Sequence, residues 1–94
     1  MNKLDITAII EWHKKNFKRA KEDSLRALFK QHKEKYLKEE SVEVLADLFI
    51  TACGIARFNA IEAMFCFSRI EDMLCGSYFA TCDLTKVIQQ KTGE

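Results

Sequence analysis

Four cysteines are the residues whose chemistry has to be weighed first. Cys53, Cys66, Cys75 and Cys82 are separated by 13, 9 and 7 residues, so no Cys-x-x-Cys pair can form the chelating loop of a structural zinc site. Cys53 and Cys66 also lie in strongly apolar segments. The pattern favours small, buried, reduced cysteines over two disulfides or a mixed Cys/His metal site. We therefore predict neither a metal nor a cofactor.

His13 and His32 occupy equivalent places in two apolar stripes that match when one is shifted by 19 residues. A histidine in an apolar stripe is typically a core residue with its hydrogen bonds satisfied. The alternatives are a pH-sensitive contact or a metal pair, but neither stripe carries a carboxylate to complete a metal site. The matching stripes are Ile6, Ile9, Ile10, His13, Phe17 and Leu25, Leu28, Phe29, His32, Tyr36.

Catalytic chemistry is hard to place on this chain. It contains no Gly-rich phosphate loop, no nucleophile elbow and no His-Glu-x-x-His motif. Glu71 and Asp72 are neighbours on a predicted helix, where adjacent side chains do not face each other. Cys75 or Cys82 would need a histidine oriented toward it, and no spacing provides one. We predict that the protein is not an enzyme.

Trp12 is the residue best suited to binding. On a helix it lies roughly 120° from the centre of the apolar stripe, on the side of Lys15 and Arg19. A large aromatic beside cations stacks on a base or fills a pocket of a partner, while the cations meet phosphate or carboxylate. The alternative is that Trp12 packs under another helix of its own chain. The predicted partner-binding residues are Trp12, Lys14, Lys15, Lys18 and Arg19.

The net charge of +1 hides a strong asymmetry along the chain. Residues 1–38 carry eleven Lys/Arg and five Asp/Glu, a balance of +6, whereas residues 39–94 carry four and nine, a balance of −5. This asymmetry favours an electrostatically steered partner or attraction between the two halves. Acidic residues interrupt the cations, so a solvated face is the alternative to a nucleic-acid surface. A helix-turn-helix around Gly54 is a weak match, because only Arg57 and Asn59 suit base edges.

The scarcity of turn-forming residues indicates that the candidate binding residues lie on helices. The chain has no Pro and only three Gly, whereas sheet proteins need frequent turns. Asp5 is a predicted N-cap, and its helix stripe extends to Ala20. Ser24 is the predicted cap of a second helix, and the short polar link 21–23 favours an antiparallel hairpin over residues 1–38.

Residues 41–75 are predicted to form hydrophobic helices. Ser41 is the predicted cap of a segment that is apolar on nearly all sides. Gly54 is a predicted helix end, and Asn59 with Glu62 has the spacing of a capping box, which favours helices near 42–55 and 59–75. One long helix from 41 to 75 is the rival. Beyond a C-cap at Gly76 and a loop over 77–82, Asp83 is predicted to cap a short helix at 83–91.

These elements predict one all-α domain over residues 1–94, with four to five helices and the N-terminal amphipathic hairpin packed on a hydrophobic helical pair. We also expect a homodimer that buries part of residues 42–70. The first residues lack the apolar run of a secretory signal, and no stretch reaches the roughly 20 apolar residues of a membrane helix, so we expect a cytoplasmic protein without a membrane partner.

Two functions fit these expectations. The first is a small non-enzymatic regulatory or inhibitory protein that docks on a protein or nucleoprotein partner through its basic, Trp-containing helical face. Small inhibitors encoded by phages and mobile elements are the analogy. The alternative is a protein that binds nucleic acid or a phosphorylated ligand directly through the same face.

Overall fold

The computed structural model describes residues 4–93, which form helices and no strands. The predicted all-α class is therefore confirmed. The ends of the predicted domain, residues 1–3 and 94, lie outside the described part. The helices are α1 (Ile6–Asn16), α2 (Glu22–Lys38), α3 (Val42–Ala56), α4 (Ala60–Cys75) and α5 (Thr81–Thr92).

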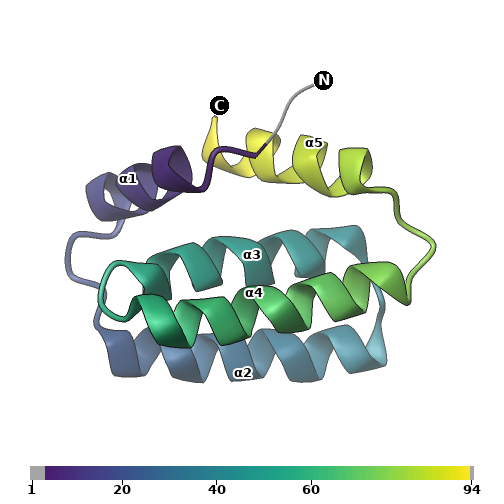
Figure 1. Cartoon of the computed structure of the whole chain (residues 1–94), viewed down its shortest axis with the longest axis horizontal. Coiled ribbons are helices and arrows are strands. Elements are labelled where there is room, and N and C mark those ends of the chain that lie inside the picture. The colour runs from purple at the N-terminus through teal and green to yellow at the C-terminus, as the bar shows by residue number, and fades with distance from the viewer. Residues whose placement is uncertain (1–3, 94) are drawn as a thin grey trace.

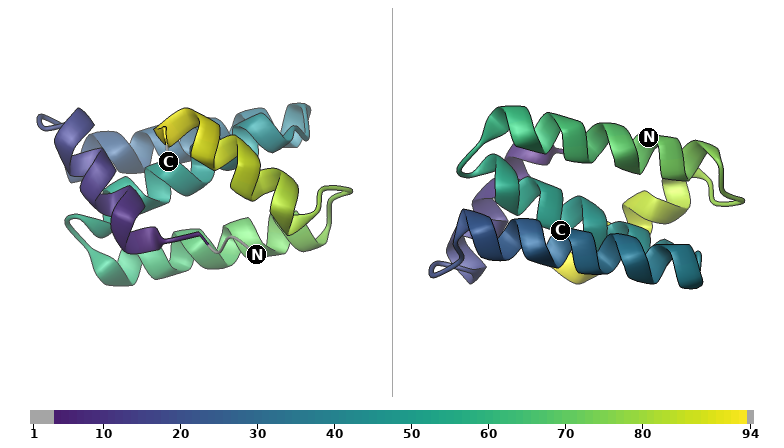
Figure 2. Two further views of the ribbon diagram at one scale, coloured as in Figure 1. Left: turned by 90° about the horizontal axis from the view of Figure 1, so that it is seen from above. Right: turned by 90° about the horizontal axis from the view of Figure 1, so that it is seen from below.

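Helix α3 lies at the centre of the fold, and each of the other four helices packs against it. α2 and α4 flank α3 in one layer, while α1 and α5 cross over the other side (Figure 1). Seen from below, α3 runs between α2 and α4 (Figure 2). This arrangement explains why the α3 sequence is apolar on nearly all sides, since each side has a covering helix.

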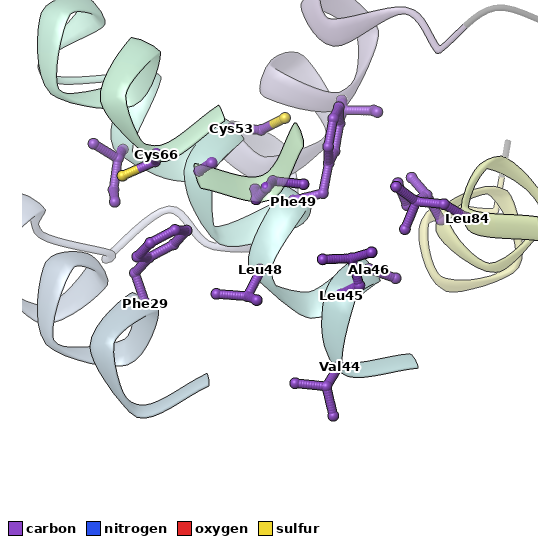
Figure 3. Close-up of a cluster of buried hydrophobic side chains, with 14 of the residues drawn as sticks. Phe29, Val44, Leu45, Ala46, Leu48, Phe49, Cys53, Cys66 and Leu84 are labelled. Atoms are coloured by element: carbon purple, nitrogen blue, oxygen red, sulfur yellow. The ribbon is translucent and has the colours of Figure 1, made fainter. Parts of the chain in front are cut away.

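The core is built from α3 outward. Leu45, Leu48 and Ile55 of α3 are completely buried. Phe29 of α2 and Cys66 of α4 lie near α3 on one side, and Leu84 of α5 on another (Figure 3). The chain itself therefore buries α3, without a second subunit.

The predicted antiparallel hairpin of the first two helices was wrong in its packing. α1 and α2 each pack on α3, and they lie in different layers (Figure 1). The link between them covers residues 17–21, because α1 ends at Asn16 and does not extend to Ala20. A distant side chain fixes this end: Arg57, just after α3, donates a hydrogen bond of 2.7 Å to the carbonyl oxygen of Phe17.

Three of the predicted N-caps are confirmed. The side chains of Asp5, Ser41 and Asn59 accept hydrogen bonds from backbone N–H groups three residues later, at 3.0–3.1 Å. Asn59 thus begins α4, and the predicted division of residues 41–75 into two helices is correct.

The caps predicted at Ser24 and Asp83 were wrong. α2 begins at Glu22, and two carboxylates in its first turn favour the positive end of the helix dipole without a capping side chain. α5 begins at Thr81, so Asp83 lies within its first turn. There its carboxylate accepts a hydrogen bond of 3.0 Å from the Ala80 N–H.

Gly54 does not end α3, which continues to Ala56. The missing side chain makes room for α1 instead. A Cβ atom at Gly54 would lie 2.5 Å from Nε2 of His13, which is well inside van der Waals contact. α1 therefore approaches α3 at a point where only glycine fits without a shift of the histidine ring.

We expect Gly54→Ala to destabilise the protein by about 1–2 kcal/mol, because overlap with His13 outweighs the roughly 1 kcal/mol that alanine gains in a helix. Urea unfolding followed by circular dichroism measures this. Gly76→Ala is the control, since a Cβ there meets its nearest atom at an ordinary 3.5 Å. Combining Gly54→Ala with His13→Ala should reduce the penalty. Equal stability of the Gly54→Ala protein and wild type would contradict the packing argument.

Candidate functional site

The helix that carries the predicted binding residues, α1, contacts α3 through a buried histidine. His13 is only 3% exposed, and its Nδ1 atom lies 2.9 Å from Nη1 of Arg57. Because a guanidinium can only donate, Nδ1 accepts, and the imidazole is neutral with its proton on Nε2. The same Arg57 nitrogen also donates to the Phe17 carbonyl. One arginine therefore fixes both the histidine and the end of α1.

The surroundings of His13 disfavour its protonated form. Burial, followed by the positive charge of Arg57, lowers the pKa of His13 from 6.5 to about 4. Burial also lowers the pKa of His32, although the nearby carboxylate of Asp47 acts in the opposite direction. Both histidines therefore favour the neutral state near pH 7.

His13 and His32 line one small cavity of about 190 Å³ between α1, α2 and α3. The walls are mainly apolar, and the carboxylate of Asp47 lies 3.2 Å from Nζ of Lys91 in an ion pair. Within residues 4–93, no cluster of three or more His, Cys, Asp or Glu side chains is arranged to hold a metal ion. The interpretation of both histidines as packed residues fits this cavity.

Trp12 lies on the outer side of α1, where it is half-buried. Its ring meets that of Phe17 edge to face, with centroids 5.6 Å apart and an interplanar angle of 72°. Phe17 is 47% exposed, although its place in the apolar stripe predicted burial. Sequence reasoning missed Phe17 as a surface residue, because the hydrogen bond that ends α1 comes from Arg57, 40 residues away.

The predicted cations lie at the C-terminal end of α1 and in the turn that follows. Lys14 is exposed and forms an ion pair of 3.0 Å with Glu11. Lys15, Lys18 and Arg19 are also exposed, and they form no ion pair within residues 4–93. The structure thus places the predicted cations on the stretch of chain that carries Trp12 and Phe17.

The cysteines do not form an activated thiol site. All four are free, and burial raises the pKa of Cys53 to about 12. Burial is also the largest cause of the raised pKa of Cys66. Their thiols stay protonated near pH 7, which makes them poor nucleophiles and poor metal ligands. The prediction of buried cysteines was wrong for Cys75 and Cys82, which are exposed.

A second surface feature escaped the sequence analysis. α2 and α4 enclose a groove of about 720 Å³, and Ile55 of α3 lies at its base. Helical spacing predicts a core stripe on α4 that leaves Phe65 and Cys66 at its edge, yet Met64 within the stripe is 69% exposed and Cys66 is buried. The predicted stripe is Ala60, Ala63, Met64, Phe67, Ile70 and Leu74. The buried side of α4 is therefore rotated from the expected one, because α4 covers one flank of α3 and leaves its other face to the groove and solvent.

No protein-family model, curated protein or solved structure matches the chain. Among residues 4–93, no helix combines the length and the apolar character needed to cross a membrane.

The lowered pKa of His13 predicts a loss of stability in mild acid. Between pH 6.5 and about 4 the unfolded chain binds a proton that the folded chain excludes, so the free energy of unfolding falls as pH decreases through this window. The full effect corresponds to at most about 3 kcal/mol. Urea unfolding at several pH values should give a shallower slope for His13→Gln than for wild type. Parallel slopes would contradict the assignment.

Proposed function

We propose that this protein is a small, non-enzymatic regulatory or inhibitory protein that docks on a protein or nucleoprotein partner through α1 and the turn after it. The docking surface consists of Trp12, Phe17, Lys14, Lys15, Lys18 and Arg19, and we call it the α1 surface. The observation that carries the proposal is the contact between the half-buried Trp12 ring and the exposed Phe17 ring, next in the chain to three exposed cations that form no ion pair within residues 4–93.

The chemistry of the α1 surface suits protein docking. Aromatic and arginine side chains are enriched among the residues that dominate binding energy in protein interfaces. The cations add steering toward an acidic partner and raise the association rate. The hydrogen bonds of Arg57 to His13 and Phe17 fix the ring pair before binding, which reduces the entropy lost on association.

Direct binding of nucleic acid or of a phosphorylated ligand is the second candidate. Lys15, Lys18 and Arg19 are exposed and form no ion pair within residues 4–93, so they can meet phosphates, and the half-buried Trp12 is the aromatic ring on which a base could stack. This function uses the same residues as the first, so the two differ in the partner and in how binding depends on salt.

We expect Arg19→Glu to abolish capture of the partner from a lysate of the native host, because it reverses an exposed charge of the α1 surface. Lys86→Glu is the matched control, since Lys86 is exposed on α5 outside this surface. Trp12→Ala should also lose the partner, with its fold checked by circular dichroism. Capture that persists in both Arg19→Glu and Trp12→Ala would contradict the proposal.

Salt and nuclease distinguish the two functions. A docked protein partner should survive nuclease treatment, and its affinity should change little between 50 and 200 mM salt. Direct phosphate binding should weaken steeply over the same range, with a slope of log K against log [salt] close to −1 for each phosphate contacted. Fluorescence anisotropy with the captured partner measures this slope. A steep slope, or loss of the partner with nuclease, would move the function to the second candidate.

Homodimer formation through residues 42–70 stays a prediction, as does a cytoplasmic location. Because α3 is covered within the chain, the large exposed apolar side chains of this range that lie outside the groove, and so remain for a dimer, are those of Phe58, Ile61 and Met64. Solution scattering should give the mass of a dimer at tens of micromolar protein. The mass of a monomer would contradict the dimer.

A further inference from the structure

The groove between α2 and α4 is a second candidate interface, separate from the α1 surface. The two helices run in the same direction along it (Figure 1), and Arg26 of α2 forms an ion pair with Glu62 of α4. α3 closes its base with Ile55. The α2 wall, from Arg26 to Glu34, is about 12 Å long, which is the length of roughly two helical turns.

The base and one lip of the groove are apolar. Phe29 and Cys66 are buried at its base, and both lie close to α3 (Figure 3). Phe65 forms part of the α4 lip and is 65% exposed. Ile61 and Met64, at 70% and 69% exposure, continue the apolar surface along the outer side of α4. Removing this surface from water requires a partner with an apolar face of its own.

The walls of the groove are basic. Lys30 and Lys33 on α2 and Arg69 on α4 line it, and within residues 4–93 they form no ion pair. Glu34 also lines the groove, so with the Arg26–Glu62 pair the lining carries four cations and two carboxylates. At one end Arg26 forms an ion pair of 3.3 Å with Glu62, which joins α2 to α4 across the groove. The unpaired cations therefore lie beyond this bridge, on both sides of the apolar base.

We propose that the α2–α4 groove binds an acidic amphipathic helix of a partner protein. The apolar face of that helix seats against Phe29 and Phe65, and Asp or Glu residues along its edges face Lys30, Lys33 and Arg69. Helices commonly bind in this way to apolar grooves between other helices. The acidic edges account for the cations, and the apolar face accounts for the exposed Phe65 side chain that lines the groove.

Charge favours this occupant over a second copy of the chain. A two-fold dimer centred on the groove would set the cations of one copy against the same cations of the other. A nucleic-acid strand would satisfy the cations but would leave the exposed Phe65 side chain without an apolar partner. The acidic amphipathic helix complements both the cations and the apolar lining of the groove.

The test uses a fluorescent, stapled helical peptide of about 14 residues, with leucines at helical spacing on one face and glutamates on its flanks. We expect it to bind the full chain and to shift the NMR signals of residues 26–34 and 62–69. The same peptide with lysine in place of glutamate should not bind. Absence of binding at millimolar peptide, equal binding of the lysine peptide, or shifts confined to the α1 surface would overturn the proposal.

Matched variants make the test specific to the groove. Lys30→Glu should weaken binding about fivefold or more, whereas Lys35→Glu, an exposed position on α2 outside the groove, should change it little. Phe65→Ser should also weaken binding, with Tyr78→Ser, at a fully exposed position of the loop before α5, as its control. Equal effects within either pair would overturn the proposal.

Two further measurements decide between the groove's occupants. A single-stranded oligonucleotide that occupied the groove more tightly than the acidic peptide would replace the proposed partner with nucleic acid. Sedimentation that showed a dimer lost in Phe65→Ser would replace it with a second copy of the chain. Because none of these variants alters the α1 surface, failure here leaves the proposed function untouched, and the reverse also holds.

Discussion

The structure depends on the burial of α3 on all of its sides. Ten of its fifteen residues are buried, from Val44 to Ile55. Such a helix is stable in water only if its own chain covers every face, because apolar burial is the main favourable term in folding. Four helices are needed to do so, and this requirement produces the two layers (Figure 2). The outer helices then keep one face for solvent, which is where both candidate surfaces lie.

One polar contact connects this core to the α1 surface. Arg57 follows directly after α3, and its guanidinium holds both the His13 ring and the carbonyl oxygen that ends α1. A neutral His13 is required, since a protonated ring could not accept from a guanidinium and would repel it. The contact therefore sets the position of Trp12 and Phe17 through the backbone of α1. The core and the proposed docking surface are joined through Arg57, so a substitution that shifts α3 also shifts the side chains of the α1 surface.

Local patterns in the sequence predicted the parts of the fold that local physics decides. The side chains of Asp5, Ser41 and Asn59 each accept a hydrogen bond from the N–H group three residues later, and such local contacts can be predicted from residue spacing. The residue at which α1 ends could not be predicted from local spacing, because it depends on a hydrogen bond from Arg57, which lies 40 residues away in the sequence. Periodicity locates an apolar stripe on a helix, but it does not say which neighbour covers it. For the same reason it failed on the burial of Met64 and on the packing of α1 against α2.

The positions of the two candidate surfaces limit how partners can bind. α1 lies in the upper layer of Figure 1, and the groove lies between α2 and α4 in the layer on the opposite side of α3. Because α3 packs against all the helices that carry these surfaces, it sets the position of each surface relative to the other.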